Sequence, residues 1–156
     1  MSVIRRRIAA LLSLTALALL TVSCGDVREQ TQAWREPPHG SSTSAGDLLI
    51  RNVVVVTDSE GNGTLYASFA NEGDEPDALT GVVIGENEAN LDGDIELPVG
   101  RVTSVSPDHE RIDVSGLDVE PGFIVDVRLI FANAPRATTE TIVQQNEGRY
   151  AHVEFG

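Results

Sequence analysis

Apolar residues recur with a period of two along much of the chain. The clearest run is Gly122–Asn133, whose polar side carries Asp126 and Arg128 and whose apolar side carries Phe123, Val125, Val127, Leu129 and Phe131. An alternation of this kind predicts a half-buried strand. No segment shows a sustained helical period of 3.6 residues. A chain with this pattern has to bury its apolar side chains between packed sheets rather than between helices.

Further strands are predicted along the rest of the chain. Leu48–Thr57 is apolar on both faces, which indicates a central strand covered on both sides. The other predicted strands are Thr64–Asn71, Leu79–Ile84, Gly100–Val105, Arg111–Val114, Thr138–Val143 and Tyr150–Phe155. Turn signals separate them, among them Gly61-Asn62-Gly63 and Glu120-Pro121-Gly122. We therefore predict that residues 47–156 form an all-β domain, an antiparallel β-sandwich of immunoglobulin-like or cupredoxin-like type with seven to eight short strands.

Residues 1–23 have the layout of a signal peptide. Arg5, Arg6 and Arg7 precede an apolar run, Ile8–Val22, which as a helix would span about 22 Å and fall short of the roughly 30 Å core of a bilayer. The run closes in the sequence LTVSC, with a small residue directly before Cys24, as at the cleavage site of bacterial lipoproteins. Cys24 is the only cysteine. We predict that it is exposed by cleavage and lipidated; the alternative is an ordinary signal peptide followed by an incidental thiol.

The charge of the mature chain restricts its partners. Without residues 1–23 it holds 8 arginines, no lysine and 24 acids, a net charge of about −16. Nucleic acid is not an expected partner, because phosphate binding needs a basic face. Anionic lipid headgroups would repel the domain, so the lipid on Cys24 has to anchor it at the outer face of the cytoplasmic membrane. With its only thiol lipidated, the domain has no disulfide.

Residues 24–46 are predicted to be the lipidated N-terminus and a flexible linker. Gly25–Gly46 lacks apolar periodicity, contains Pro37-Pro38 and ends in small polar residues. Trp34 is its one large apolar residue. Either this tryptophan contacts the bilayer interface or the domain, or it docks onto a partner.

The three histidines do not share the spacing of a metal site. His39 lies in the linker, His109 lies in a turn, and His152 is placed on the outward side of the last predicted strand. None of them shares a short motif with another histidine or with a cysteine, so we expect solvated surface histidines and no bound metal or other cofactor. His109 and His152 are the alternative candidates for a divergent metal site.

No other group of residues indicates catalysis. Asp58–Gly63 has some resemblance to a calcium loop, but the twelfth position of such a loop is Phe69 here, so a hairpin turn is predicted instead. No Gly-x-Ser-x-Gly motif is present, and we expect no enzymatic activity. Five acids are expected to form a solvated edge: Glu86, Glu88, Asp92, Asp94 and Glu96.

Two stretches resemble a known family. Leu65–Leu79, LYASFANEGDEPDAL, is similar to the segment of periplasmic copper chaperones of the PCu(A)C type in which Tyr, Asn-x-Gly, Asp and Leu recur. Gly116–Gln144 resembles the C-terminal strands of that family. Together with the lipobox and linker, the whole chain resembles the LpqE-type lipoproteins of actinobacteria, a divergent branch of the same fold. The resemblance implies a cupredoxin-like β-sandwich.

The copper ligands that the resemblance implies are missing. The family binds Cu(I) through His and Met, and its His-x-Met pair falls near Arg111 and Asp113, while an upstream His falls near Leu91 or Asp92. The only methionine is Met1. We therefore expect a non-catalytic envelope lipoprotein that binds other proteins, as an accessory or assembly factor of a membrane complex, and we expect no copper. The alternative is an extracytoplasmic metal (copper) chaperone with a divergent site.

Overall fold

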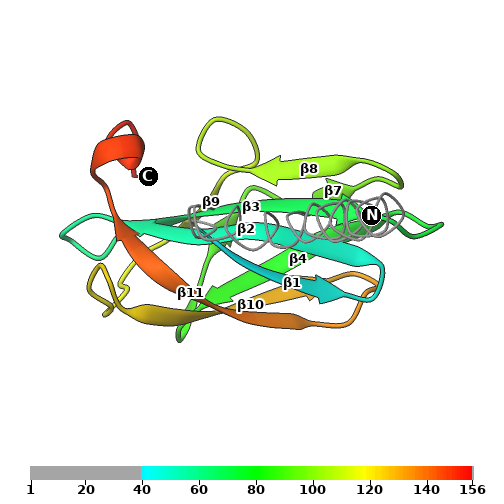
Figure 1. Ribbon diagram of the computed structural model, residues 1–156, viewed down its shortest axis with the longest axis horizontal. Coiled ribbons are helices and arrows are strands. Elements are labelled where there is room, and N and C mark those ends of the chain that lie inside the picture. The colour runs from blue at the N-terminus through cyan, green and yellow to red at the C-terminus, as the bar shows by residue number, and fades with distance from the viewer. Residues whose placement is uncertain (1–39, 156) are drawn as a thin grey trace, which may run out of the picture. The chain divides into compact units, whose positions relative to one another are not determined.

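The computed structural model describes residues 40–155, which form two packed layers of strands (Figure 1). A single turn of 3₁₀ helix, η1 (Gly148–Tyr150), follows the last strand. The strands in chain order are β1 (Ser41–Ala45), β2 (Leu48–Thr57), β3 (Gly63–Asn71), β4 (Asp77–Ile84), β5 (Asn87–Glu88), β6 (Asn90–Leu91), β7 (Ile95–Leu97), β8 (Val102–Val105), β9 (Ile112–Val114), β10 (Ile124–Phe131) and β11 (Ala137–Gln145). Within these residues no helix is long and apolar enough to cross a membrane.

Strand β11 connects the two layers. Its first part, residues 137–142, pairs antiparallel with β10, which in turn pairs with β4. Its last part, Val143 to Gln145, pairs with β2 in the parallel direction, and β2 pairs with β3 on its other side. The strands follow the order β5-β4-β10-β11-β2-β3-β9-β6, with β1, β7 and β8 attached to β2, β4 and β3. The predicted all-β sandwich is confirmed, and the β2–β11 pair is the parallel exception to its antiparallel pairing.

The alternation in β10 buries one face of the strand. Val125, Val127, Leu129 and Phe131 are buried, whereas Asp126 and Arg128 are exposed, as predicted. Phe131 meets Phe69 of β3 edge to face, with ring centroids 6.2 Å apart, so the two layers share one core. The prediction was wrong for Phe123, which is 62% exposed. Its N–H bonds to the carbonyl of Glu120 in the preceding turn, while its carbonyl accepts the N–H of Val143, so Phe123 lies where the turn meets the strand.

Strand β2 is covered on both faces, as its sequence predicts. Val53, Val54, Val55, Val56 and Thr57 are all buried. Asn52 has a left-handed backbone (φ 55°), and the register with β3 shifts between Arg51 and Val54. This bulge changes which side chains point to the core, so the inward set of the strand is not the same before and after it.

The predicted end of the linker was wrong. The linker was expected to reach Gly46, but Ser41–Ala45 forms β1, which pairs with β2. Small polar residues are typical of linkers, yet an edge strand needs only backbone pairing, which composition does not reveal. Residues 24–39 of the predicted linker, including Cys24, Trp34 and His39, lie outside the described residues, as does the signal peptide.

Tyr150–Phe155 was predicted to be a strand and instead forms turns. The N–H groups of Ala151 and Val153 bond to carbonyls three residues earlier, and Gly148 has a left-handed φ of 58°. Ala151, expected to point inward, is exposed, whereas Val153 is buried. The other seven predicted strands are present, and three short strands, β5 to β7, lie in the acidic segment where none was predicted.

Candidate functional site

The positions that the family resemblance assigns to copper ligands lie side by side in the structure. Strand β9 pairs with β6, so that Ile112 lies opposite Leu91 and Asp113 lies opposite Asn90. Arg111 and Asp113 are two residues apart on an extended segment, the spacing that places two side chains on one face. The fold therefore places the upstream position beside the segment of the His-x-Met pair, but Leu91 shares the face of the buried Ile112, opposite to that of Arg111 and Asp113.

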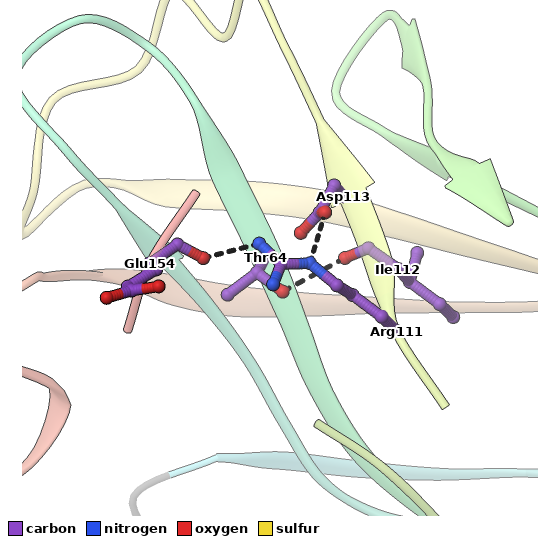
Figure 2. Close-up of polar contacts among 5 residues, drawn as sticks. All are labelled: Thr64, Arg111, Ile112, Asp113 and Glu154. Atoms are coloured by element: carbon purple, nitrogen blue, oxygen red, sulfur yellow. Dashed lines mark hydrogen bonds and ion pairs between the residues drawn. The ribbon is translucent and has the colours of Figure 1, made fainter. Parts of the chain in front are cut away.

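An ion pair occupies this place. The Nε of Arg111 lies 2.5 Å from Oδ2 of Asp113, and the same guanidinium donates from Nη2 to the carbonyl oxygen of Glu154 (Figure 2). The hydroxyl of Thr64 donates to the carbonyl of Ile112 over 3.1 Å and ties β9 to β3. Arginine remains protonated in proteins, so this position holds a permanent positive charge.

The C-terminal segment partly covers the ion pair. Glu154 accepts from Arg111, and the side-chain amide of Asn146 donates to the carbonyl of Val153 over 3.1 Å. The ring of Tyr150 packs against Tyr66 with centroids 5.4 Å apart. The side chains of Arg111 and Asp113 remain 31% and 22% exposed.

Tyr66 lies in the same neighbourhood. Burial raises the pKa of its hydroxyl, Tyr150 and Asp108 raise the pKa further, and Arg111 acts in the opposite direction. The hydroxyl oxygen is buried and has no hydrogen-bond partner among the described residues. Since an elevated pKa keeps the phenol protonated at neutral pH, Tyr66 does not supply an anionic ligand.

These residues do not fit a copper ion. Cu(I) prefers thiolate, thioether and imidazole ligands, and residues 40–155 contain no cysteine and no methionine. No group of three histidine, cysteine or acidic side chains that could hold a metal is found in the described part of the chain. Oδ1 of Asp113 is buried without a partner, but the guanidinium next to the carboxylate would repel a metal cation.

The alternative metal candidates lie on the surface. His109 is exposed in the β8–β9 loop, where its Nδ1 lies 3.2 Å from the hydroxyl of Ser106. His152 is exposed in the turns after η1, so its predicted exposure is confirmed although the strand is not. The five acids of the predicted solvated edge are all exposed as well: Glu86, Glu88, Asp92, Asp94 and Glu96.

The Asp58–Gly63 segment is a hairpin turn between β2 and β3. Oδ1 of Asp58 accepts the N–H groups of Glu60 and Asn62, and Oδ2 accepts the amide of Asn62. Burial alone raises the pKa of Asp58, but these hydrogen bonds outweigh it and lower the pKa. Both oxygens of the carboxylate therefore accept hydrogen bonds within the turn, as expected for a hairpin rather than a calcium loop.

The residues that match the family pattern hold the fold. The side-chain amide of Asn71 donates to the carbonyls of Glu75 and Leu97, and its oxygen accepts from the N–H of Gly73. Asp77 accepts three backbone N–H groups, described below. Sequence reasoning gave neither residue a role. The Asn-x-Gly signal marks a turn that needs an internal acceptor, and this signal could have identified Asn71.

Comparisons with known proteins agree with the fold. No family model matches the chain, and no curated protein matches it. Among solved structures, it is similar to the copper-bound PCuAC domain from PmoF2, with a TM-score of 0.58, 19% identity, and 67% of this chain and 98% of that one covered. It is also similar to the apo PCuAC domain from PmoF1, with a TM-score of 0.62, 19% identity, and 67% of this chain and 99% of that one covered. For the apo PmoF2 PCuAC domain the TM-score is 0.60 and the identity 19%, with 69% of this chain and 98% of that one covered. At this identity the likeness establishes the fold: the described domain has the architecture of PCuAC domains.

Proposed function

We propose that this protein is a non-enzymatic, extracytoplasmic lipoprotein of LpqE type that uses the PCuAC fold to bind another protein instead of carrying Cu(I). In this proposal the lipid on Cys24 anchors it at the outer face of the cytoplasmic membrane. The observation that supports protein binding over copper binding is the Arg111–Asp113 ion pair at the place of the His-x-Met ligands. The guanidinium of Arg111 supplies at this position the positive charge that a bound metal cation would supply in a copper-binding domain.

The structural neighbours favour the other reading, in which the protein handles metal. They are PCuAC domains, and one of them is described as copper-bound. A metal-handling protein of this fold would need a divergent site of hard ligands, for which His109, His152 and nearby carboxylates are the candidates. We place this reading second, because the shared fold does not supply ligands and the candidates do not form a cluster in the described residues.

A Cu(I) competition experiment separates the two functions. The mature protein, extracted in detergent, is titrated with Cu(I) held by a chromogenic chelator. We expect no transfer of copper to the unmodified protein, because its described domain has no sulfur ligand. A variant with Arg111→His, Asp113→Met and Asp92→His supplies both the His-x-Met pair and the upstream His of the family, and is expected to withdraw copper from the chelator.

The contrary result is equally clear. Withdrawal of one equivalent of Cu(I) by the unmodified protein, abolished by His109→Ala or His152→Ala, would replace protein binding with metal handling as the function. Arg111→Lys serves as a matched control for the restored variant, because it removes the ion-pair geometry without adding a soft ligand.

A further inference from the structure

Large apolar side chains are exposed together at one end of the β10–β11 pair. Ile124 is 62% exposed and Ile142 is 49% exposed, and the two residues lie directly opposite each other in the register. Opposed side chains on one face of an antiparallel pair are about 5 Å apart, so these two form one patch. Phe123, also 62% exposed, precedes Ile124 and by the alternation of the strand belongs to the opposite face, so it is not part of this patch.

The next outward pair on the same face is acidic. Asp126 lies opposite Glu140, and both side chains are exposed. Like charges directly opposite each other destabilise a strand pair. The outward arginine nearest to Asp126 on β10, Arg128, donates to the carbonyl of Gly85. The domain thus retains an unfavourable charge pair directly beside its exposed apolar pair.

We infer that this face, defined by Ile124, Asp126, Glu140 and Ile142, is the docking surface for a protein partner that presents an apolar contact flanked by arginine or lysine. The inference rests on the proposed protein-binding function and specifies its surface. Basic side chains of the partner would neutralise the two carboxylates, while its apolar contact would cover the isoleucines.

Charge favours this occupant over two others. A bilayer with anionic headgroups would repel the carboxylate pair, and the mature chain carries 24 acids against 8 arginines. A second copy of the chain would bring a second acidic pair to the same face. A protein partner whose apolar contact is flanked by basic residues matches both the isoleucines and the carboxylates of this face.

The surface is separate from the Arg111–Asp113 ion pair. In the strand order, β2 and β3 lie between β11 and β9. Variants of the surface therefore leave the former ligand positions unchanged, and the two functions can be tested independently.

Photocrosslinking in native membranes tests the surface. A benzophenone amino acid replaces Ile142 in the full-length lipoprotein, and in a matched strain it replaces Val102 of β8, which is 66% exposed and apolar but distant in the strand order. We expect a protein adduct from position 142 alone, mapped to a partner segment that contains arginine or lysine. Its yield should fall several-fold as the salt concentration rises, because the screening length shortens.

Charge reversal provides the second measurement. Asp126→Arg places opposite charges across the pair with Glu140, so the variant should melt at the same temperature or higher, yet lose most of the adduct. Glu60→Arg makes the same charge change in the β2–β3 turn and should leave the adduct intact.

Different results would refute the proposed surface and the proposed function. An adduct at position 102 but not at 142 would overturn this surface and leave protein binding standing. A lipid adduct, or an adduct with a second copy, at position 142 would overturn the occupant, and an adduct insensitive to Asp126→Arg would overturn its charge basis. Absence of protein adducts at both positions, together with Cu(I) binding by the unmodified protein, would refute the proposed function as well.

Discussion

Asp77 connects two distant segments through its carboxylate, and removing it should cost a large share of the stability. Its side chain is 8% exposed at the start of β4. Oδ1 accepts the N–H groups of Ala78 (2.8 Å) and Asn133 (2.9 Å), and Oδ2 accepts that of Ala134 (2.7 Å). The last two belong to the β10–β11 loop, more than fifty residues away in sequence. The perturbation is Asp77→Ala, compared with Asp77→Asn.

The number of bonds sets the magnitude. A hydrogen bond to a charged group contributes about 1.5–3 kcal/mol, and bonds that share one acceptor group are not additive. Water reaches the partly exposed loop and replaces some of what is lost. We therefore expect Asp77→Ala to lower the free energy of unfolding by about 3–4 kcal/mol. Asp77→Asn keeps one oxygen acceptor and should cost about 1.5–3 kcal/mol.

The pH dependence of this loss has a defined sign. Burial by itself raises the pKa of Asp77, but the backbone N–H donors outweigh it and hold the pKa below its usual value. A lowered pKa in the folded state means that the carboxylate stabilises the fold above the pKa of the unfolded chain. That stabilisation is lost as the pH falls through the folded pKa. The difference between the unmodified protein and Asp77→Asn should therefore shrink as the pH is lowered below about 4.

Urea unfolding measured at several pH values checks both points. Asp74→Ala is the matched control, because it removes an exposed acid three residues earlier in the same loop and should cost little. Equal midpoints for the unmodified protein and Asp77→Ala at pH 7 would refute the reasoning. A difference that persists unchanged at acidic pH would refute its electrostatic part.

Three other outcomes are expected. Cys24→Ser should yield an uncleaved precursor or a released soluble form, and mature-sized protein that still partitions with detergent would contradict lipidation. Leu129→Ala should lower the free energy of unfolding by about 2–5 kcal/mol, because a buried side chain leaves a cavity, whereas Asp126→Ala should cost little; urea midpoints in the reverse order would contradict the strand phase. Cu(I) should not raise the melting temperature of the mature protein. A tight ligand at a hundredfold its dissociation constant would raise the free energy of unfolding by about 2.7 kcal/mol. A melting shift of that size with Cu(I), abolished by His109→Ala, would contradict the proposal.

The strands that the sequence predicts best are those whose side chains are sorted by burial. In β10 the buried valines and Leu129 alternate with Asp126 and Arg128, and each residue independently indicates the same phase. Alternation assigns a side chain to a face but does not reveal where the core ends, and Phe123, beside the turn that precedes β10, is 62% exposed. β1 escaped prediction for the opposite reason: its serines and threonine carry no burial signal, and backbone pairing with β2 decides its structure.

The candidate site shows a different limit. The resemblance identifies which positions would hold copper, and the loss of His and Met there is visible in the sequence alone. That the carbonyl of Glu154 accepts from Arg111 depends on how the last ten residues turn. The short apolar alternation in Tyr150–Phe155 resembles that of a strand. The turn that begins at Gly148 instead directs this segment onto the ion pair.

The change of partner within β11 affects the order in which the domain can assemble. Val143 pairs with Val55 across 88 residues of sequence, and the hydroxyl of Thr141 bonds to the carbonyl of Val53 over 2.7 Å. Pairings of such long range form slowly, because the intervening chain must first be brought together. Until β11 pairs, the edge of β2 at Val55 to Thr57, beyond the part that β1 covers, remains unpaired, and unpaired apolar strand edges promote aggregation. In a nascent chain this part of the edge therefore stays unpaired until Val143 to Gln145 have emerged, and a truncation before Val143 should destabilise β2 as well as β10.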